Sequence, residues 1–197
     1  KFSPIMTHRS PAAATTTPRL SGSILLEQIQ IATKEYGEEA IARAKASLPE
    51  KTRAALADLL TITWIETAMA QEIKDTIARE VGQDPIAFQK WVVRSAIGGV
   101  IGKFWRVLLA RVSDGAIVKR APIIYSKTFD VGRLEVTTFD GRAATLRVVG
   151  WNDMPDYDAI GLAAGIEAVL EYAGRKGARV TFARSGEIMG FSLTWDA

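Results

Sequence analysis

The chain of 197 residues contains no cysteine and a single histidine, His8. The lack of cysteine excludes disulfide bonds, thiolate metal sites and thiol catalysis. A catalytic triad or a histidine metal site needs imidazoles placed in a pocket, whereas His8 lies in a proline-rich N-terminal stretch. We therefore expect no metal, no cofactor and a reducing, cytoplasmic environment.

Long apolar runs and a strong charge of one sign are also lacking. The most apolar window, 96–112, is interrupted by Lys103, Arg106 and Arg111 and is shorter than the ~20 apolar residues that span a bilayer. The 25 basic and 22 acidic residues alternate along most segments, unlike the clustered basic residues of nucleic-acid-binding proteins. We expect neither a membrane span nor a nucleic-acid partner.

Hydrophobic residues make up 48% of the chain, which is enough for one good core and excludes general disorder. Residues 1–20 are rich in proline, threonine and alanine without an amphipathic period, which indicates a flexible tail. Removing them should leave the melting temperature nearly unchanged. We predict one α+β domain over 21–197, helical over 21–127 and sheet-containing over 128–197.

Apolar residues recur at three- and four-residue intervals over 61–81, which predicts one long amphipathic helix. This helix is our candidate for a dimer contact, with its polar positions Glu66, Lys74 and Asp75 outside any interface. Further helices are predicted over 23–36, 38–47, 49–60, from Pro85 to a bend or close contact at Gly98-Gly99, over 100–112 and over 116–126.

The pattern changes to alternating apolar and polar residues after Phe129. Strands over 133–139 and 143–150 are joined by Asp140-Gly141, a strong hairpin signal, and a second hairpin follows a helix over 154–173. Each strand has one apolar face, as in a sheet covered on one side. The predicted fold is α+β: an N-terminal helical half packed on one face of a four-stranded antiparallel sheet, with a β-β-α-β-β C-terminal half.

Acidic and glycine clusters have structural interpretations that outweigh functional ones. Asp153, Asp156 and Asp158 surround a helix start, where carboxylates complement the helix dipole, and they lack the spacing of an EF-hand. Gly161 and Gly165 share a helix face and favour close approach of that helix to the sheet over ligand contact.

Aromatic residues offer the only candidate site. They come from consecutive helices and from the last strand, and they are expected to face the apolar side of the sheet: Trp91, Phe104, Trp105, Tyr125 and Trp195. Filling of the core is the simpler interpretation. If the helices stand slightly off the sheet, the same residues would line an apolar pocket for a small molecule.

The C-terminal part of the sequence contains an apolar helix followed by Ile-Ile-Tyr-Ser-Lys-Thr-Phe at 123–129, Gly-Arg-Leu-Glu-Val at 132–136, a hairpin, Val-Gly-Trp at 149–151, a glycine-bearing helix and a closing hairpin. This order of motifs resembles the NO-signalling/Golgi-transport ligand-binding superfamily. That superfamily includes haem–nitric-oxide-binding domains, vinyl-4-reductase domains and TRAPP subunits. The closest likeness is to a family of myxobacterial proteins of similar length.

The resemblance implies helices packed on an antiparallel sheet, a cavity between them and dimerisation through helices. It does not carry over haem binding, because haem-binding members use a proximal histidine and a Tyr-x-Ser-x-Arg motif. Tyr125-Ser126-Lys127 matches that motif only superficially. Metal-binding vinyl-4-reductase-type domains and acylated TRAPP subunits use cysteine, which is absent here.

The sequence shows no convergent nucleophile, base and orienting group, so we expect no enzymatic activity. The favoured hypothesis is a protein-interaction or scaffolding module that forms a homo-oligomer through its helices or binds a protein partner. The alternative is a sensor domain that binds an apolar small molecule between helices and sheet without haem. An apolar cavity would discriminate between the two.

Overall fold

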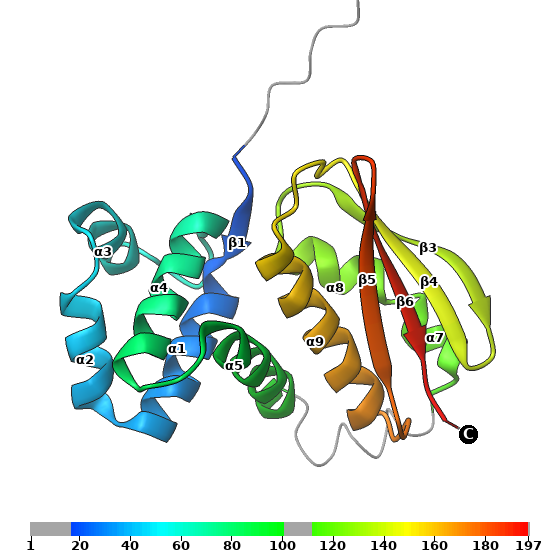
Figure 1. Ribbon diagram of the computed structural model, residues 1–197, viewed down its shortest axis with the longest axis horizontal. Coiled ribbons are helices and arrows are strands. Elements are labelled where there is room, and N and C mark those ends of the chain that lie inside the picture. Colours follow the sequence, from blue (N-terminus) through cyan, green and yellow to red (C-terminus); the bar gives the residue numbers. More distant parts are fainter. Residues whose placement is uncertain (1–16, 101–111, 197) are drawn as a thin grey trace, which may run out of the picture.

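The computed structural model describes residues 17–100 and 112–196. Figure 1 shows helices α1 to α5 on one side, the four-stranded sheet on the other and helix α9 between them. The N-terminal elements, in chain order, are β1 (Arg19–Ser21), α1 (Gly22–Tyr36), α2 (Glu38–Ala46), α3 (Glu50–Ala57), β2 (Trp64–Glu66), α4 (Thr67–Glu80) and α5 (Pro85–Val100).

The first strand changes two of the predicted boundaries. β1 pairs antiparallel with β2, so Arg19 and Leu20, which were assigned to the tail, belong to a strand pair, and Leu20 is only 5% exposed. The predicted helix over 61–81 is wrong for its first turns, because 64–66 is extended to form this pair and the helix begins at Thr67. Residues 1–16 of the predicted tail lie outside the described residues.

The C-terminal half follows the predicted order of elements. It comprises α7 (Asp114–Val118), α8 (Ala121–Thr128), β3 (Arg133–Asp140), β4 (Ala143–Val149), α9 (Asp156–Tyr172), β5 (Arg179–Ser185) and β6 (Ile188–Thr194). The helix predicted over 116–126 is two short helices. The helix predicted over 100–112 falls almost wholly outside the described part of the chain.

The four strands form one antiparallel sheet in the order β3-β4-β6-β5, which confirms the predicted fold class. Leu146 opposes Phe191 and Val148 opposes Met189, and these four side chains are buried. The predicted apolar face is therefore the covered one. A register shift between Val136 and Thr138 interrupts the alternation on the edge strand.

Helix α9 lies between the N-terminal helices and the sheet. A methyl group on Gly161 would lie 2.4 Å from Gln89 Nε2, and one on Gly165 would lie 3.4 Å from Val93 Cγ1. These glycines therefore allow close approach of α9 to α5 rather than to the sheet, which corrects the prediction. α5 continues through Gly98, where the missing side chain leaves room for the Tyr172 hydroxyl.

Within the described segments, no helix has the length and apolar character needed to cross a membrane.

Candidate functional site

A cavity of about 130 Å³ lies where the two halves of the protein meet. Its walls come from α1 and α5 on one side and from α7, α8, α9 and the sheet on the other. Most lining side chains are apolar, among them Ile24, Val93, Ile97, Leu162 and Leu193. The cavity is thus mainly apolar and is lined by residues of both halves.

One part of the lining is polar. Gln28 of α1, Lys74 of α4, Gln89 of α5 and Asp158 of α9 line the cavity, and we call these four residues the polar cluster. Their exposed fractions are 4%, 4%, 3% and 7%, so four helices turn polar side chains into the protein interior. Buried polar groups of this kind are costly unless they are paired, so each requires an explanation.

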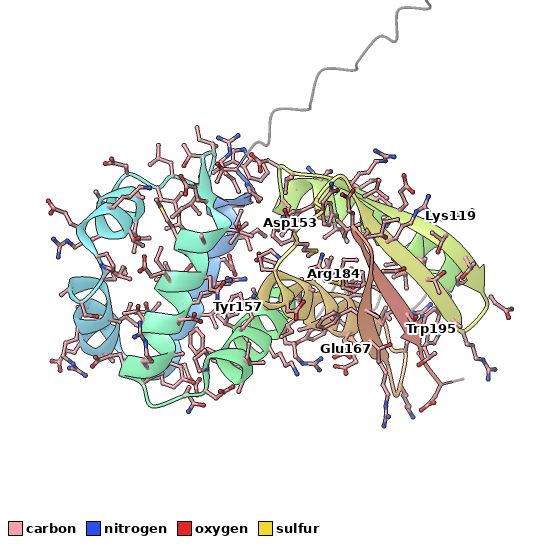
Figure 2. All side chains as sticks on the ribbon, turned by 45° about the horizontal axis from the view of Figure 1, so that its top comes forward. Lys119, Asp153, Tyr157, Glu167, Arg184 and Trp195 are labelled. Atoms are coloured by element: carbon pink, nitrogen blue, oxygen red, sulfur yellow. The ribbon has the colours of Figure 1, made fainter. Side chains whose placement is uncertain are left out.

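Lys74 and Asp158 carry opposite charges without a direct ion pair in the described part of the chain. Lys74 Nζ instead lies 5.0 Å from the ring centroid of Tyr157, a cation–π contact. Figure 2 shows Tyr157 on α9 where this helix meets the N-terminal helices.

Burial shifts the pKa of both charged groups in the direction that favours the uncharged form. It lowers the pKa of Lys74 to about 8, against the attraction of the Asp158 and Asp75 carboxylates. It raises the pKa of Asp158 to about 6, against the attraction of Lys74. At pH 7 Lys74 is therefore mainly protonated and Asp158 mainly ionised, and the polar cluster carries no net charge.

Both amides of the polar cluster have an unused acceptor. Gln28 Oε1 and Gln89 Oε1 are buried and have no hydrogen-bond partner among the described residues. The Tyr157 hydroxyl and the Asp75 carboxylate are also buried near Lys74, and these two groups interact with each other. An unsatisfied buried polar atom costs roughly 1–3 kcal/mol, so the cavity retains unused capacity for hydrogen bonds.

The three described aromatic residues of the five proposed from the sequence do not gather in one place. Tyr125 lines the cavity, and its hydroxyl donates a 2.9 Å hydrogen bond to the Val131 carbonyl. Trp91 packs against Tyr36 and Phe88 and is not among the lining residues.

Trp195 donates a 3.3 Å hydrogen bond from Nε1 to Asp114 and also lies outside the lining. Figure 2 shows it after the last strand, away from Tyr157. Phe104 and Trp105 lie outside the described residues.

Sequence reasoning missed the polar cluster, although helical spacing carried a signal. Lys74 follows Ala70 by four residues and precedes Ala78 by four, so it shares the buried face of α4. It is enclosed within the protein, whereas the sequence predicted only that it lies outside a dimer interface. Asp158 lies in the first turn of α9, as predicted, but it precedes Gly161 by three residues and turns inward.

No family model matches this sequence, and a search of curated proteins found no match. Solved structures similar to this chain are H-NOX domains. An Fe(II) unliganded H-NOX protein from K. algicida has a TM-score of 0.64 at 12% identity, covering 90% of this chain and 97% of its own. An oxygen-bound H-NOX domain related to soluble guanylate cyclases has a TM-score of 0.59 at 12% identity, covering 90% and 96%.

A mutant of T. Tengcongensis H-NOX has a TM-score of 0.59 at 14% identity and covers 90% of this chain and 98% of its own. At these identities the likeness shows a shared fold. It agrees with the fold that the resemblance implied, whereas membership of the superfamily and the likeness to myxobacterial proteins stay predictions.

The H-NOX comparison raises the question whether this cavity could hold haem. Protein ligands to haem iron are histidine, cysteine, methionine or tyrosine. Among the described lining residues only Tyr125 belongs to this set, and its hydroxyl is bonded to Val131 while burial raises its pKa. The described residues also contain no cluster of histidine, cysteine or carboxylate side chains suited to a metal ion. The residues present do not fit haem.

Proposed function

We propose that this protein is a sensor-type domain that binds a small, mainly apolar molecule without haem. The observation that carries the proposal is the apolar cavity at the junction of the two halves. It favours the sensor hypothesis over the scaffolding module, because a scaffolding module needs no internal space. One structural neighbour is an oxygen-binding H-NOX domain, so a small ligand suits this fold.

The volume of the cavity limits the size of the ligand. An engineered apolar cavity of ~150 Å³ in another protein stays dry and binds benzene or xenon. The cavity here, about 130 Å³, is of the same order. A ligand with one aromatic ring would therefore fill it, contacting apolar side chains that otherwise lack neighbours.

The position of the cavity suggests how occupancy would be transmitted. Val93 and Ile97 of α5 line one side, and Leu162 and Ile166 of α9 line the other. A ligand contacting both helices would stabilise one arrangement of the two halves over others. Homodimerisation through helices and a cytoplasmic location stay predictions.

The proposal is tested by measuring toluene binding calorimetrically or by thermal shift. Ala96→Leu places a larger side chain in the cavity and should abolish binding, whereas Ala87→Leu makes the same change at an exposed position of the same helix and should leave binding intact. Saturating toluene should also raise the melting temperature of the unaltered protein. Equal binding by both variants would contradict the proposal, as would an unaltered protein that binds neither toluene nor the other one-ring probes described below.

A further inference from the structure

We infer that the polar cluster selects a ligand bearing a hydrogen-bond donor, so that the cavity takes a neutral one-ring molecule with a hydroxyl group, of the phenol type. This inference rests on the proposed function and specifies its ligand class. It follows from the unused acceptors, the balance of charge and the small volume of the cavity.

The unused acceptors indicate which group the ligand must carry. Gln28 Oε1 and Gln89 Oε1 come from different helices, and both side chains line the same cavity. Because neither oxygen has a partner in the described parts of the chain, a purely apolar ligand would leave both unsatisfied. A ligand O–H satisfies one of them after a rotation of the terminal amide, which removes part of the burial cost.

The charges on the cavity wall favour a neutral group. Lys74 and Asp158 both line the cavity and balance each other at neutral pH. A carboxylate or an ammonium group on the ligand would add an uncompensated charge to a buried site, which is strongly unfavourable. A hydroxyl adds no charge, and its oxygen can also accept a hydrogen bond from Lys74.

The neighbouring helix makes room for one of these amides. Gln89 Nε2 lies so close to Gly161 of α9 that a methyl group there would be 2.4 Å away. A side chain at position 161 would therefore displace the Gln89 amide from its present position. The amide is held between two helices that belong to different halves of the protein, where a ligand contact would affect both.

Matched aromatic probes separate this inference from the proposed function. In a wholly apolar cavity toluene binds more tightly than phenol, because phenol gives up hydrogen bonds to water without replacing them. We expect the reverse order here, with phenol binding more tightly than toluene. Anisole, which only accepts hydrogen bonds, and benzoate, which is charged, should both bind more weakly than phenol.

Variants locate the selective group. Gln89→Met keeps the shape of the side chain but removes the amide, and it should weaken phenol binding by about five- to tenfold while leaving toluene binding unchanged or improved. Gln83→Met, at an exposed glutamine that does not line the cavity, is the matched control and should change neither constant. Gln28→Met provides an independent second variant should Gln89→Met fail to fold.

The outcomes are distinct. If toluene binds but phenol binds more weakly, or if anisole equals phenol, the donor-selective ligand is overturned and the apolar sensor remains. If both glutamine variants bind phenol as the unaltered protein does, the cluster does not select the ligand. If none of the probes binds, the proposed function fails, and this inference fails with it.

Discussion

At the scale of single residues, Lys74 and Asp158 set the electrostatics of the cavity. Both side chains are almost completely buried, at 4% and 7% exposure, and come from helices in different halves. For each group, the cost of removing the charge from water is larger than the favourable attraction between the two charges. The pKa of Lys74 is therefore lowered and the pKa of Asp158 is raised. The protein therefore carries a titratable pair at its proposed ligand site, which the sequence pattern did not predict.

This pair predicts a pH-dependent stability. The folded-state pKa of Asp158 is about 6, above its ordinary 3.8, so the folded protein binds this proton more readily than the unfolded chain between those values. The free energy of unfolding therefore falls as the pH rises from 4 to 6. Asp158→Asn removes the titration, so its stability relative to the unaltered protein should increase across this window by up to roughly 3 kcal/mol.

Urea denaturation at several pH values measures this difference. Asp153→Asn, at an exposed position just before α9, is the control and should run parallel to the unaltered protein. Parallel curves for Asp158→Asn as well would show that Asp158 titrates normally in the folded state.

At the scale of elements, the close contact between the start of α1 and the loop before β2 fixes the N-terminal half. The Gly22 amide donates a 2.8 Å hydrogen bond to the Thr63 carbonyl. A methyl group on Gly22 would lie 2.2 Å from the Leu60 carbonyl oxygen, which is backbone and cannot move aside like a side chain. Only glycine therefore fits here without displacing the loop.

Gly22→Ala should destabilise the protein by about 2 kcal/mol, in the range of overpacked cores. Gly165→Ala is the matched comparison, because its methyl group would meet Val93 at 3.4 Å, an ordinary contact, and alanine favours the helix. We expect the second variant to be neutral or slightly stabilising in thermal or denaturant unfolding. If both variants lost the same amount of stability, the contact at Gly22 would be no more restrictive than the ordinary contact at Gly165.

At the scale of the whole molecule, β1 ties the two halves together near the cavity. The Arg19 side chain forms a 2.5 Å ion pair with Asp130. The Arg19 backbone carbonyl also accepts a hydrogen bond from the Asp130 backbone amide. Leu20 is buried, bridges to Phe129 and lines the cavity. This short strand therefore contacts β2 of the helical half and the segment leading into the sheet.

A chain that starts at residue 21 should consequently melt about 5 °C below a chain that starts at residue 17. Losing the buried Leu20 side chain costs about 2 kcal/mol, and each 1 kcal/mol lowers the melting temperature of a protein this size by about 2–4 °C. The comparison isolates residues 17–20, and calorimetry of the two truncated chains provides it. Identical melting temperatures would support the original expectation that residues 1–20 can be removed without effect.

Local pattern was sufficient to predict most of the secondary structure. The strands on either side of Asp140 and Gly141 were predicted almost to the residue, because a period of two and a turn residue act over short distances. The boundary at 61–66 was wrong, because the pairing with β1 depends on residues about 45 positions away, and such long-range pairing can override local preference.

The sequence by itself determined the α+β class, the hairpins and the absence of a cysteine or multi-histidine site, since these depend on composition and local periodicity. Only the tertiary structure decided that α9 lies between helices and sheet, that Tyr125 faces a cavity, and that Gln28, Lys74, Gln89 and Asp158 meet there. The physical reason is that these four side chains come from four helices spread between positions 22 and 172, and packing determines which polar side chains are enclosed.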